Sequence, residues 1–343
     1  HQWFYAMLGS DERAHPWLDE GPTSYLENLY FLQKQDTTAP SIGDLSVRLL
    51  DAGLQQYYMH RRRKHQGQSV RDSATAYSFG QYYLEVYWRA ARALRYLERY
   101  LGRDAFARGL RQYYRQWHGR HPDAQAFQRA MENASGRRLD WFFEETLTSR
   151  TPFDVQLRAK GGGNYQLQKS GLPNTPVLLQ TGDQRMRWIR FRKDTLLRLD
   201  VDSAFSPVVN PDMLLPESYL VNNQPAWKPR LSFLYRPEEP GIGHLFFMPV
   251  PGFNVSDGFL GGLGFYNRPI PAPRVQYTLL PMYGFRSSAF RGMAGIRGRH
   301  YWRSPDGGRQ WTTATAGYRR FGYERSVTTA GDQFVNRFQR FRG

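Results

Sequence analysis

The sequence predicts a multidomain chain in which a helical part is followed by β-structure. Its 343 residues are enough for more than one hydrophobic core, and this length suggests two or three domains. Apolar residues recur with helical spacing up to about residue 150, and after Thr151-Pro152 they alternate with a period of two. We therefore expect domains at 1–150, 152–226 and 229–343.

The composition is that of a folded protein without a helical membrane anchor. Hydrophobic residues make up 40% of the chain and aromatic residues 15%, which argues against extensive disorder. No segment reaches the roughly 18 consecutive apolar residues that a membrane-spanning helix needs. The chain has no cysteine, which excludes disulfides and thiolate metal sites.

The net charge of +17 raises the question of nucleic-acid binding. Residues 274–343 carry thirteen Arg against Asp306, Glu324 and Asp332, a net charge of +10, in a segment with strand periodicity. A second basic cluster is Arg61–Lys64. Since no helix-turn-helix, zinc-finger or RNA-binding motif accompanies these charges, we expect a solvated face or a pore lining and no nucleic-acid partner.

The helical part contains one segment with a particularly clear pattern, residues 84–102. Tyr87, Ala91, Leu94 and Leu101 fall on one stripe of this helix, and Gly102 ends it. We expect an earlier helix to start near Glu20, with Pro22 in its first turn, and Asp104 to cap the next helix. The remaining helical segments are 104–119, 123–136 and 137–147.

Residues 152–226 contain short alternating segments separated by Gly, Pro and Asp, which predicts a small β-sandwich. Gly161-Gly162-Gly163 lies between two of these segments and does not open a helix. We therefore interpret it as a turn and not as a phosphate-binding loop.

Residues 229–343 alternate over longer stretches. In residues 290–302, Phe290, Ala294, Ile296 and Trp302 fall on one face, and the other face carries Arg291, Met293, Arg297, Arg299 and Tyr301. Lipid-facing and lumen-facing residues of outer-membrane strands alternate in this way, and so do the two faces of a half-buried soluble sheet. Only about four such strands are present, too few to close a barrel, so we expect the start of an antiparallel, β-barrel-like sheet.

The first twenty residues have the spacing of a metal site. Eighteen residues separate His1 from Glu20. A zinc site of the H-E-x-x-H type takes two His from one helix and a carboxylate from the next, leaving a fourth position for water.

The segment HQWFYAMLGSDERAHPWLDEG resembles the second half of the zinc motif of the alanyl-aminopeptidase family of gluzincin metallopeptidases. That motif is H-E-x-x-H-Q-W-F, an eighteen-residue spacer and the Glu of W-L-[ND]-E-G. The resemblance implies that His1 and Glu20 bind Zn²⁺. It also implies the helical C-terminal half of a thermolysin-like catalytic domain, and a peptide substrate with a free N-terminus.

A second match concerns VYWRAARALRYLERYLG, which resembles the family's helix that follows a catalytic Tyr. The resemblance implies that Tyr87 donates a hydrogen bond to the oxyanion of the tetrahedral intermediate, with Tyr82 and Tyr83 as alternatives. Arg89-Ala90 replaces the Lys-Gly that the family has there, a change that keeps the charge and a small residue.

The resemblance also places part of the active site before residue 1. The first zinc His, the general-base Glu and the G-x-M-E-N exopeptidase motif would all precede His1. We therefore expect the 343-residue chain by itself to be inactive as a peptidase.

Each candidate residue also has an ordinary structural explanation. His1 would fit on any amphipathic helix, Glu20 would complement a helix dipole, and Tyr87 would fit in a core stripe. Asp19, next to Glu20, is a candidate to orient a metal-bound His. The agreement of so many ordered landmarks favours the zinc site.

Residues 152–343 resemble, more weakly, the C-terminal part of envelope-associated members from Bacteroidetes-type bacteria. The segments PDMLLPESYLVNNQ and GFNVSDGFLGGLGFYN carry this likeness. It implies a bacterial cell-envelope location, periplasm or outer membrane, with membrane association through 229–343. The alternative function is a non-catalytic envelope scaffold with a degenerate peptidase domain.

Overall fold

A computed structural model describes residues 6–35, 42–182, 185–201, 205–303, 309–325 and 327–342. The chain divides into two compact units, which are described separately. Unit 1 comprises residues 1–62 and 66–226, and unit 2 comprises residues 63–65 and 227–343. The division into three domains that the sequence suggests stays a prediction.

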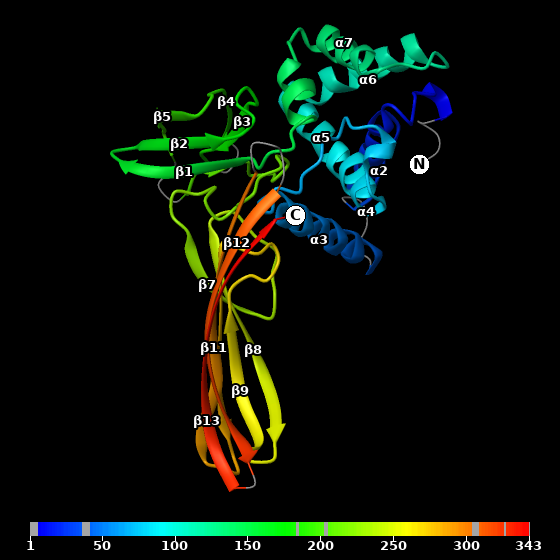
Figure 1. Cartoon of the computed structure of the whole chain (residues 1–343). Helices are drawn as coiled ribbons and strands as arrows, with labels where there is room; N and C mark the ends of the chain where they lie inside the picture. Colours follow the sequence, from blue (N-terminus) through cyan, green and yellow to red (C-terminus); the bar gives the residue numbers. More distant parts are fainter. Residues whose placement is uncertain are drawn as a thin grey trace. The chain divides into compact units, whose positions relative to one another are not determined.

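Unit 1 begins with helices, which Figure 1 shows in blue to green. In chain order they are α2 (Pro16–Gln35), α3 (Ile42–Arg63), the 3₁₀ turn η1 (Ala74–Ala76), α4 (Phe79–Tyr82), the π-helix η2 (Tyr83–Arg89), α5 (Ala90–Leu101), α6 (Arg103–Trp117), α7 (Ala124–Ser135) and the π-helix η3 (Trp141–Thr146). The predicted order of helices before strands is confirmed.

Two predicted helix starts are wrong. Helix α2 begins at Pro16, four residues before Glu20, because proline suits the first helical position, where its missing N–H has no partner to lose. Pro22 therefore lies inside the helix and not in its first turn. Helix α6 begins at Arg103 with Gly102 as the N-cap, so Asp104 lies in its first turn.

Helix α7 shows the local interactions that fix a helix of this length. The side chain of Asp123 accepts a hydrogen bond from the Ala126 N–H at 2.8 Å, which satisfies one of the first amides of the helix. The helix ends at Gly136, whose φ of +65° is a left-handed conformation that glycine adopts without strain.

Aromatic side chains fill the core between α2, α6 and α7. The ring of Phe127 lies 6.0 Å from that of Trp17, 5.1 Å from that of Tyr113 and 6.1 Å from that of Phe143, all edge to face. Trp17, Tyr113 and Phe127 are 0% exposed. Such pairs contribute beyond the area they bury, so this cluster holds the helices in register.

Two small antiparallel sheets complete unit 1. The first has the strand order β1-β2-β5 and the second β4-β3-β6, in agreement with the predicted short strands. Their bounds are β1 (Asp154–Gly161), β2 (Asn164–Ser170), β3 (Val177–Gln180), β4 (Met186–Ile189), β5 (Asp194–Arg198) and β6 (Val208–Val209). Buried residues of both sheets, such as Leu157, Leu167 and Leu179, belong to the same hydrophobic cluster as the helices.

The glycine run is a turn, as predicted. Gly161, Gly162 and Gly163 join β1 to β2 with φ angles of +86°, +59° and +76°. Three successive positive φ angles need glycine at each position.

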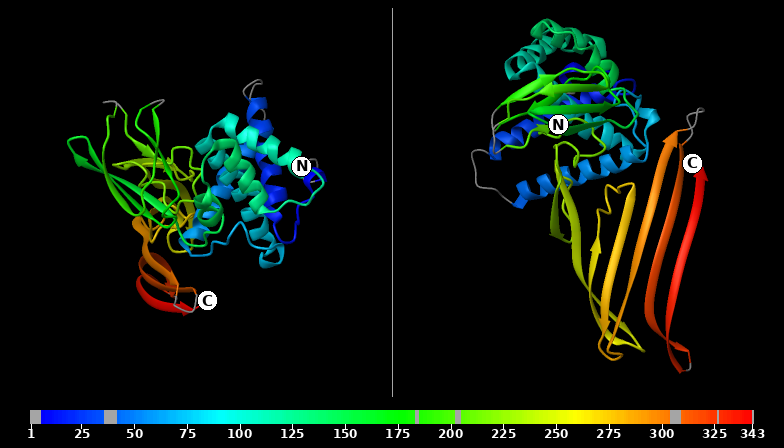
Figure 2. Two further views of the ribbon diagram at one scale, coloured as in Figure 1. Left: turned by 90° about the horizontal axis from the view of Figure 1, so that it is seen from above. Right: turned by 90° about the vertical axis from the view of Figure 1, so that its left-hand side faces the viewer.

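Unit 2 is one seven-stranded sheet with the order β13-β12-β11-β10-β9-β8-β7, visible in Figure 2 as yellow to red strands. An antiparallel sheet is confirmed for β8 to β13, but β7 pairs in parallel with β8. The strands are β7 (Lys228–Phe233), β8 (Ile242–Asn254), β9 (Gly258–Tyr266), β10 (Val275–Gly284), β11 (Ala289–Arg303), β12 (Arg309–Arg325) and β13 (Val327–Arg342).

Strand β7 pairs in parallel with β8 because of the path of the segment that connects the two strands. The link from Phe233 to Ile242 turns the chain back so that β8 runs in the same direction, with Lys228 opposite Ile242 and Phe233 opposite Phe247. Strands β7 and β13 are the two edges of the sheet. Within the described ranges, none of the helices combines the length and the hydropathy needed to cross a bilayer.

Replacing Phe127 by Ala tests the aromatic core. Because Phe127 is 0% exposed and touches three rings, we expect Phe127→Ala to lower the free energy of unfolding by about 3–5 kcal/mol. The matched control is Phe79→Ala, since Phe79 is 95% exposed and its loss should change stability by less than about 0.5 kcal/mol. Urea denaturation followed by circular dichroism measures both, and equal losses would contradict the assignment of the core.

Candidate functional site

Glu20 is presented by the second turn of α2. The two preceding apolar residues, Trp17 and Leu18, are fully buried and fix the rotation of the helix about its axis. On the same turn Asp19 is buried and Glu20 is half-buried. The helix therefore points one carboxylate into the protein and directs the next toward a neighbouring helix.

Tyr87 lies on that neighbouring helix, in the π-helical segment η2. A π-helix has a wider turn than an α-helix and is frequent at functional sites. Leu84, Glu85, Val86 and Arg89 of this segment are buried, and Tyr87 is half-buried. The ring of Tyr87 is stacked on that of Tyr83 at 5.5 Å and meets that of Tyr82 at 5.9 Å, nearly edge to face.

The two predicted residues meet in the structure. The Tyr87 hydroxyl donates a hydrogen bond to Oε1 of Glu20 at 2.5 Å, although 67 positions separate the residues in the sequence. Burial of the phenol is the largest cause that raises the pKa of Tyr87 above its usual value, followed by the hydrogen bond to Glu20 and the charge of Glu20. The phenol therefore keeps its proton at neutral pH and is a hydrogen-bond donor.

A close approach of the two helices makes this contact possible. A Cβ atom at Gly21 would lie 2.8 Å from the Cβ of Ala90, closer than two carbon atoms can be. A glycine at this position of α2 and an alanine at this position of α5 therefore allow the backbones to come together.

Arg89 does not point toward the Glu20–Tyr87 pair. Its buried guanidinium forms an ion pair with Glu85 at 2.9 Å and donates to the carbonyls of Gln68 and Thr146, each at 2.7 Å. These contacts connect η2 to the segments around it. The arginine that replaces a lysine of the resembling family thus has a structural role in this chain.

Asp19 is a buried carboxyl with one oxygen unsatisfied among the described residues. Its Oδ1 accepts a hydrogen bond from the Ser10 hydroxyl, whereas Oδ2 has no partner in the described part of the chain. Burial raises the pKa of Asp19 to about 7, the Ser10 hydrogen bond opposes this rise, and the charge of Glu20 adds to it. A buried carboxylate oxygen of this kind is stabilised by a proton, an N–H donor or a cation.

The carboxylates of Asp19 and Glu20 supply part of a binding site for a divalent cation. Glu20 offers a carboxylate of the kind that zinc accepts, and the unsatisfied Oδ2 of Asp19 lies on the adjacent residue. Over the residues that the structure describes, no three His, Asp or Glu side chains gather to hold a metal. His1, the other predicted ligand, lies outside the described residues.

Two histidines that the sequence leaves without a role bind the loop before α2, His15 from within it and His121 from the segment between α6 and α7. His121 Nδ1 lies 2.5 Å from the carbonyl oxygen of Gly9, where the backbone has a φ of +62°. His15 is half-buried, and its backbone N–H donates to the backbone carbonyl of Asp11 at 2.7 Å. Both therefore contribute to the conformation of residues 6–15.

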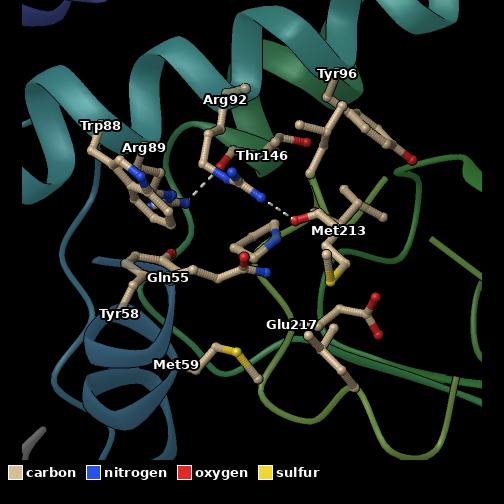
Figure 3. Close-up of a pocket in the computed structure, with 15 residues that line it drawn as sticks. Gln55, Tyr58, Met59, Trp88, Arg89, Arg92, Tyr96, Thr146, Met213 and Glu217 are labelled. Atoms are coloured by element: carbon tan, nitrogen blue, oxygen red, sulfur yellow. Dashed lines mark hydrogen bonds between the residues drawn. The ribbon is translucent and has the colours of Figure 1, made fainter. Parts of the chain in front are cut away.

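A separate cavity lies beside η2 and α5 (Figure 3). It is lined by residues of α3, of η2 and α5, and of the loop at 213–220. Glu20 and Tyr87 are not among its lining residues, so it is distinct from the pair described above. Periodicity could not have predicted it, because the loop at 213–220 has none.

Most polar groups that line this cavity already interact with other groups of the protein. Arg92 donates to the carbonyl of Met213 at 2.6 Å and its guanidinium lies 4.8 Å from the Trp88 ring. Glu217 is buried, which raises its pKa well above the usual value, and it accepts hydrogen bonds from Asn210, Asn223 and the Val155 N–H. These bonds connect the helices to the small sheets of unit 1. The cavity therefore has a structural explanation.

Comparison with known proteins gives one family match. Residues 1–146 match the model of the peptidase family M1 domain, so both Glu20 and Tyr87 lie inside the matched segment. A search of curated proteins found no match.

Among solved structures, the chain is similar to aminopeptidase A of Legionella pneumophila, determined in complex with aspartic acid. The sequence identity is 15% and the TM-score 0.45, over 59% of this chain and 24% of that protein. The chain thus spans about a quarter of the length of this neighbour. Residues 1–146 are thus the part of the chain that is similar to the peptidase family M1 domain.

Proposed function

We propose that this chain is part of a zinc-dependent metallopeptidase, an aminopeptidase that removes N-terminal residues from peptides with a free N-terminus. The observation that carries the proposal is the 2.5 Å hydrogen bond between Tyr87 and Glu20, inside the segment that matches the peptidase family. A carboxylate and a protonated phenol, brought together from two helices, are suited to hold a metal and to donate to a reacting oxygen.

Glu20 and His1 would hold the zinc, with the remaining protein ligand from residues that the resemblance places before His1. When bound, the metal supplies a Lewis acid for the scissile carbonyl and lowers the pKa of a water molecule. Asp19, directly beside Glu20, would accept an N–H bond from a ligand imidazole through its unsatisfied Oδ2.

Tyr87 would stabilise charge on the substrate. Its raised pKa keeps the proton on the phenol, and exchange of the Glu20 carboxylate for a substrate oxygen would let the same O–H donate to the oxyanion. The stacked ring of Tyr83 restricts the rotation of the Tyr87 side chain and so limits the positions that the phenol can reach.

The alternative, a non-catalytic envelope scaffold, predicts that Glu20 and Tyr87 can be replaced without consequence for chemistry. The two experiments below separate these functions. Both use the gene product that contains this chain together with any residues encoded before His1.

Replacing Tyr87 by Phe removes one hydrogen-bond donor and leaves the ring. We expect Tyr87→Phe to lower kcat on an aminoacyl p-nitroanilide by about 10²–10³, with little change in KM or zinc content. Tyr30→Phe, on an exposed part of α2, is the matched control and should retain activity. A comparable loss in Tyr82→Phe or Tyr83→Phe, with Tyr87→Phe active, would show that the wrong phenol has been assigned.

Replacing Glu20 by Gln removes the charge of the predicted ligand and keeps its shape. Replacing a residue that only supports a metal ligand weakens metal affinity about 10- to 100-fold. We therefore expect Glu20→Gln, which changes a predicted ligand itself, to lose at least that much zinc affinity. Zinc content by plasma emission spectroscopy, with circular dichroism to check folding, measures the effect. Glu27→Gln, further along α2 and exposed, should bind zinc like the parent. Full zinc retention in Glu20→Gln would rule out Glu20 as a ligand.

A further inference from the structure

The sheet of unit 2 has one face that is almost free of polar side chains. Cross-strand partners point to the same face of a sheet, so the registers of β8 to β11 assign every residue to a side. One side, called here the apolar face, carries Phe253, Phe259, Leu263, Val275, Tyr277, Leu279, Phe285, Phe290 and Ile296, all of which are exposed.

No charged residue lies on this face along β8, β9 and β10, which the structure describes in full. The first arginine on it is Arg320, on β12. The exposures are large, for example 78% for Phe290 and 50% for Leu279. A continuous exposed apolar surface of this kind marks an interaction with a membrane or with another protein.

The opposite side, called here the arginine face, carries Arg291, Arg297 and Arg299 of β11. Arg299 donates to the Gln276 side chain at 3.1 Å, and Arg291 forms an ion pair at 2.7 Å with Asp257, in the turn between β8 and β9. Polar residues of this face therefore bind one another.

Asp257 shows that the sheet curls toward the arginine face. Its carboxylate accepts hydrogen bonds from the Ser287 hydroxyl at 2.6 Å and from the Gly322 N–H of β12 at 2.9 Å, besides the bond from Arg291. In a flat sheet, three steps of about 4.8 Å would separate β9 from β12 by about 14 Å. The contact between Asp257, in the turn before β9, and Gly322 of β12 therefore indicates a curved sheet.

The same carboxylate is well satisfied in this position. Burial would raise the pKa of Asp257, but the hydrogen bonds from Ser287, Asn254, the Gly322 N–H and Arg291 outweigh burial and lower it to about 2. A buried charge with this many donors is a stable feature. The concave side of the sheet thus combines internally bonded polar groups with buried apolar side chains, Phe246, Leu260 and Met282.

The convex side of this sheet differs from that of a curled sheet surrounded by water. In a curled sheet surrounded by water, the concave side encloses the apolar core and the convex side carries the polar residues. Here the convex side is the apolar face and the concave side is the arginine face. A convex side made of exposed apolar residues favours contact with an apolar medium.

The dimensions of the apolar face agree with those of a bilayer. Along β10 and the residue that follows it, the face extends from Val275 to Phe285, which is ten steps or about 34 Å of strand. With the tilt of about 40° that is usual for membrane strands, this length corresponds to about 26 Å along the membrane normal. The apolar band of outer-membrane strands is about 25 Å tall.

A protein partner would fit this face less well. Interfaces between proteins carry about one hydrogen bond per 100–200 Å² and are rimmed by polar residues. The apolar face offers hydroxyl groups only from Tyr277 and Tyr283 across β8 to β10, with carbon side chains around them. Acyl chains require no hydrogen bonds from the surface that they cover.

We propose that the apolar face of β8 to β11 contacts the acyl chains of a lipid bilayer, while the arginine face is turned away from lipid. This inference is independent of the proposed peptidase activity. It also gives a physical basis for the proposed location in a bacterial cell envelope.

The chain has no cysteine, so a single introduced cysteine can be labelled specifically. Leu279→Cys places a bimane fluorophore on the apolar face, and Thr278→Cys places it on the arginine face one residue away. Ile296→Cys and Arg297→Cys form a second pair on β11. The full chain is refolded with phosphatidylcholine vesicles, with or without a spin label on the acyl chains, and isolated by flotation.

We expect acyl-chain spin labels to quench positions 279 and 296 several-fold more than positions 278 and 297. Iodide in the aqueous phase should show the opposite order. A third readout is Leu279→Lys, which should reduce the vesicle-bound fraction about tenfold or more, since lysine on a lipid-facing surface is strongly unfavourable. Thr278→Lys should have a much smaller effect.

Three results would overturn the proposal. The first is a chain with native circular dichroism that does not float with vesicles. The second is equal quenching of both members of each pair. The third is a vesicle-free dimer in light scattering whose positions 279 and 296 are protected from iodide, which would show that a second copy covers the face.

Discussion

The crossing of α2 over α5 is the constraint on which the rest of unit 1 depends. Gly21 and Ala90 leave room for two backbones to approach more closely than larger side chains would allow. A larger side chain at Gly21 would push the helices apart by about 1 Å, the difference between 2.8 Å and an ordinary carbon–carbon contact. The hydrogen bond between Tyr87 and Glu20 depends on this separation, because O–H···O bonds extend only to about 3.0 Å.

The aromatic core around Trp17 and the buried ion pair of Arg89 stabilise the two helices that cross here. Trp17 anchors α2 against Phe127 and Phe143, and Arg89 ties η2 to backbone carbonyls of other segments. Each anchor lies within three residues of the side chain that it positions. The rigid part of the structure is therefore immediately next to the polar pair, which favours a preorganised site.

Much of this could be predicted from sequence because it depends on short-range patterns. The stripe of Ala91, Leu94 and Leu101 is buried as its spacing indicates, and the glycine run is a turn because three positive φ angles leave no alternative. The pairing of Glu20 with Tyr87 was accessible only through resemblance to a family, since no periodicity links residues 67 positions apart.

Other features could not be predicted. The start of α2 was missed because Pro16 follows a loop without a clear capping residue, and proline signals both a loop and a first turn. The parallel pairing of β7 depends on how the connection between β7 and β8 turns, which alternation within a strand does not encode. The curl of the sheet in unit 2 depends on Asp257, whose partners lie on three other segments.

The π-helical turn that carries Tyr87 makes the chain intolerant of small insertions and deletions there. A π-helical segment holds one residue more than the α-helical turns that it replaces. Deleting one residue between Tyr83 and Arg89 would therefore restore ordinary α-geometry with the flanking turns close to their present orientation, but it would shift the side chains inside the segment. The phenol would then leave Glu20 while every helical hydrogen bond was still formed. Local backbone regularity and the geometry of the polar pair are therefore in conflict at this turn, and the irregular conformation is the one that keeps the pair together.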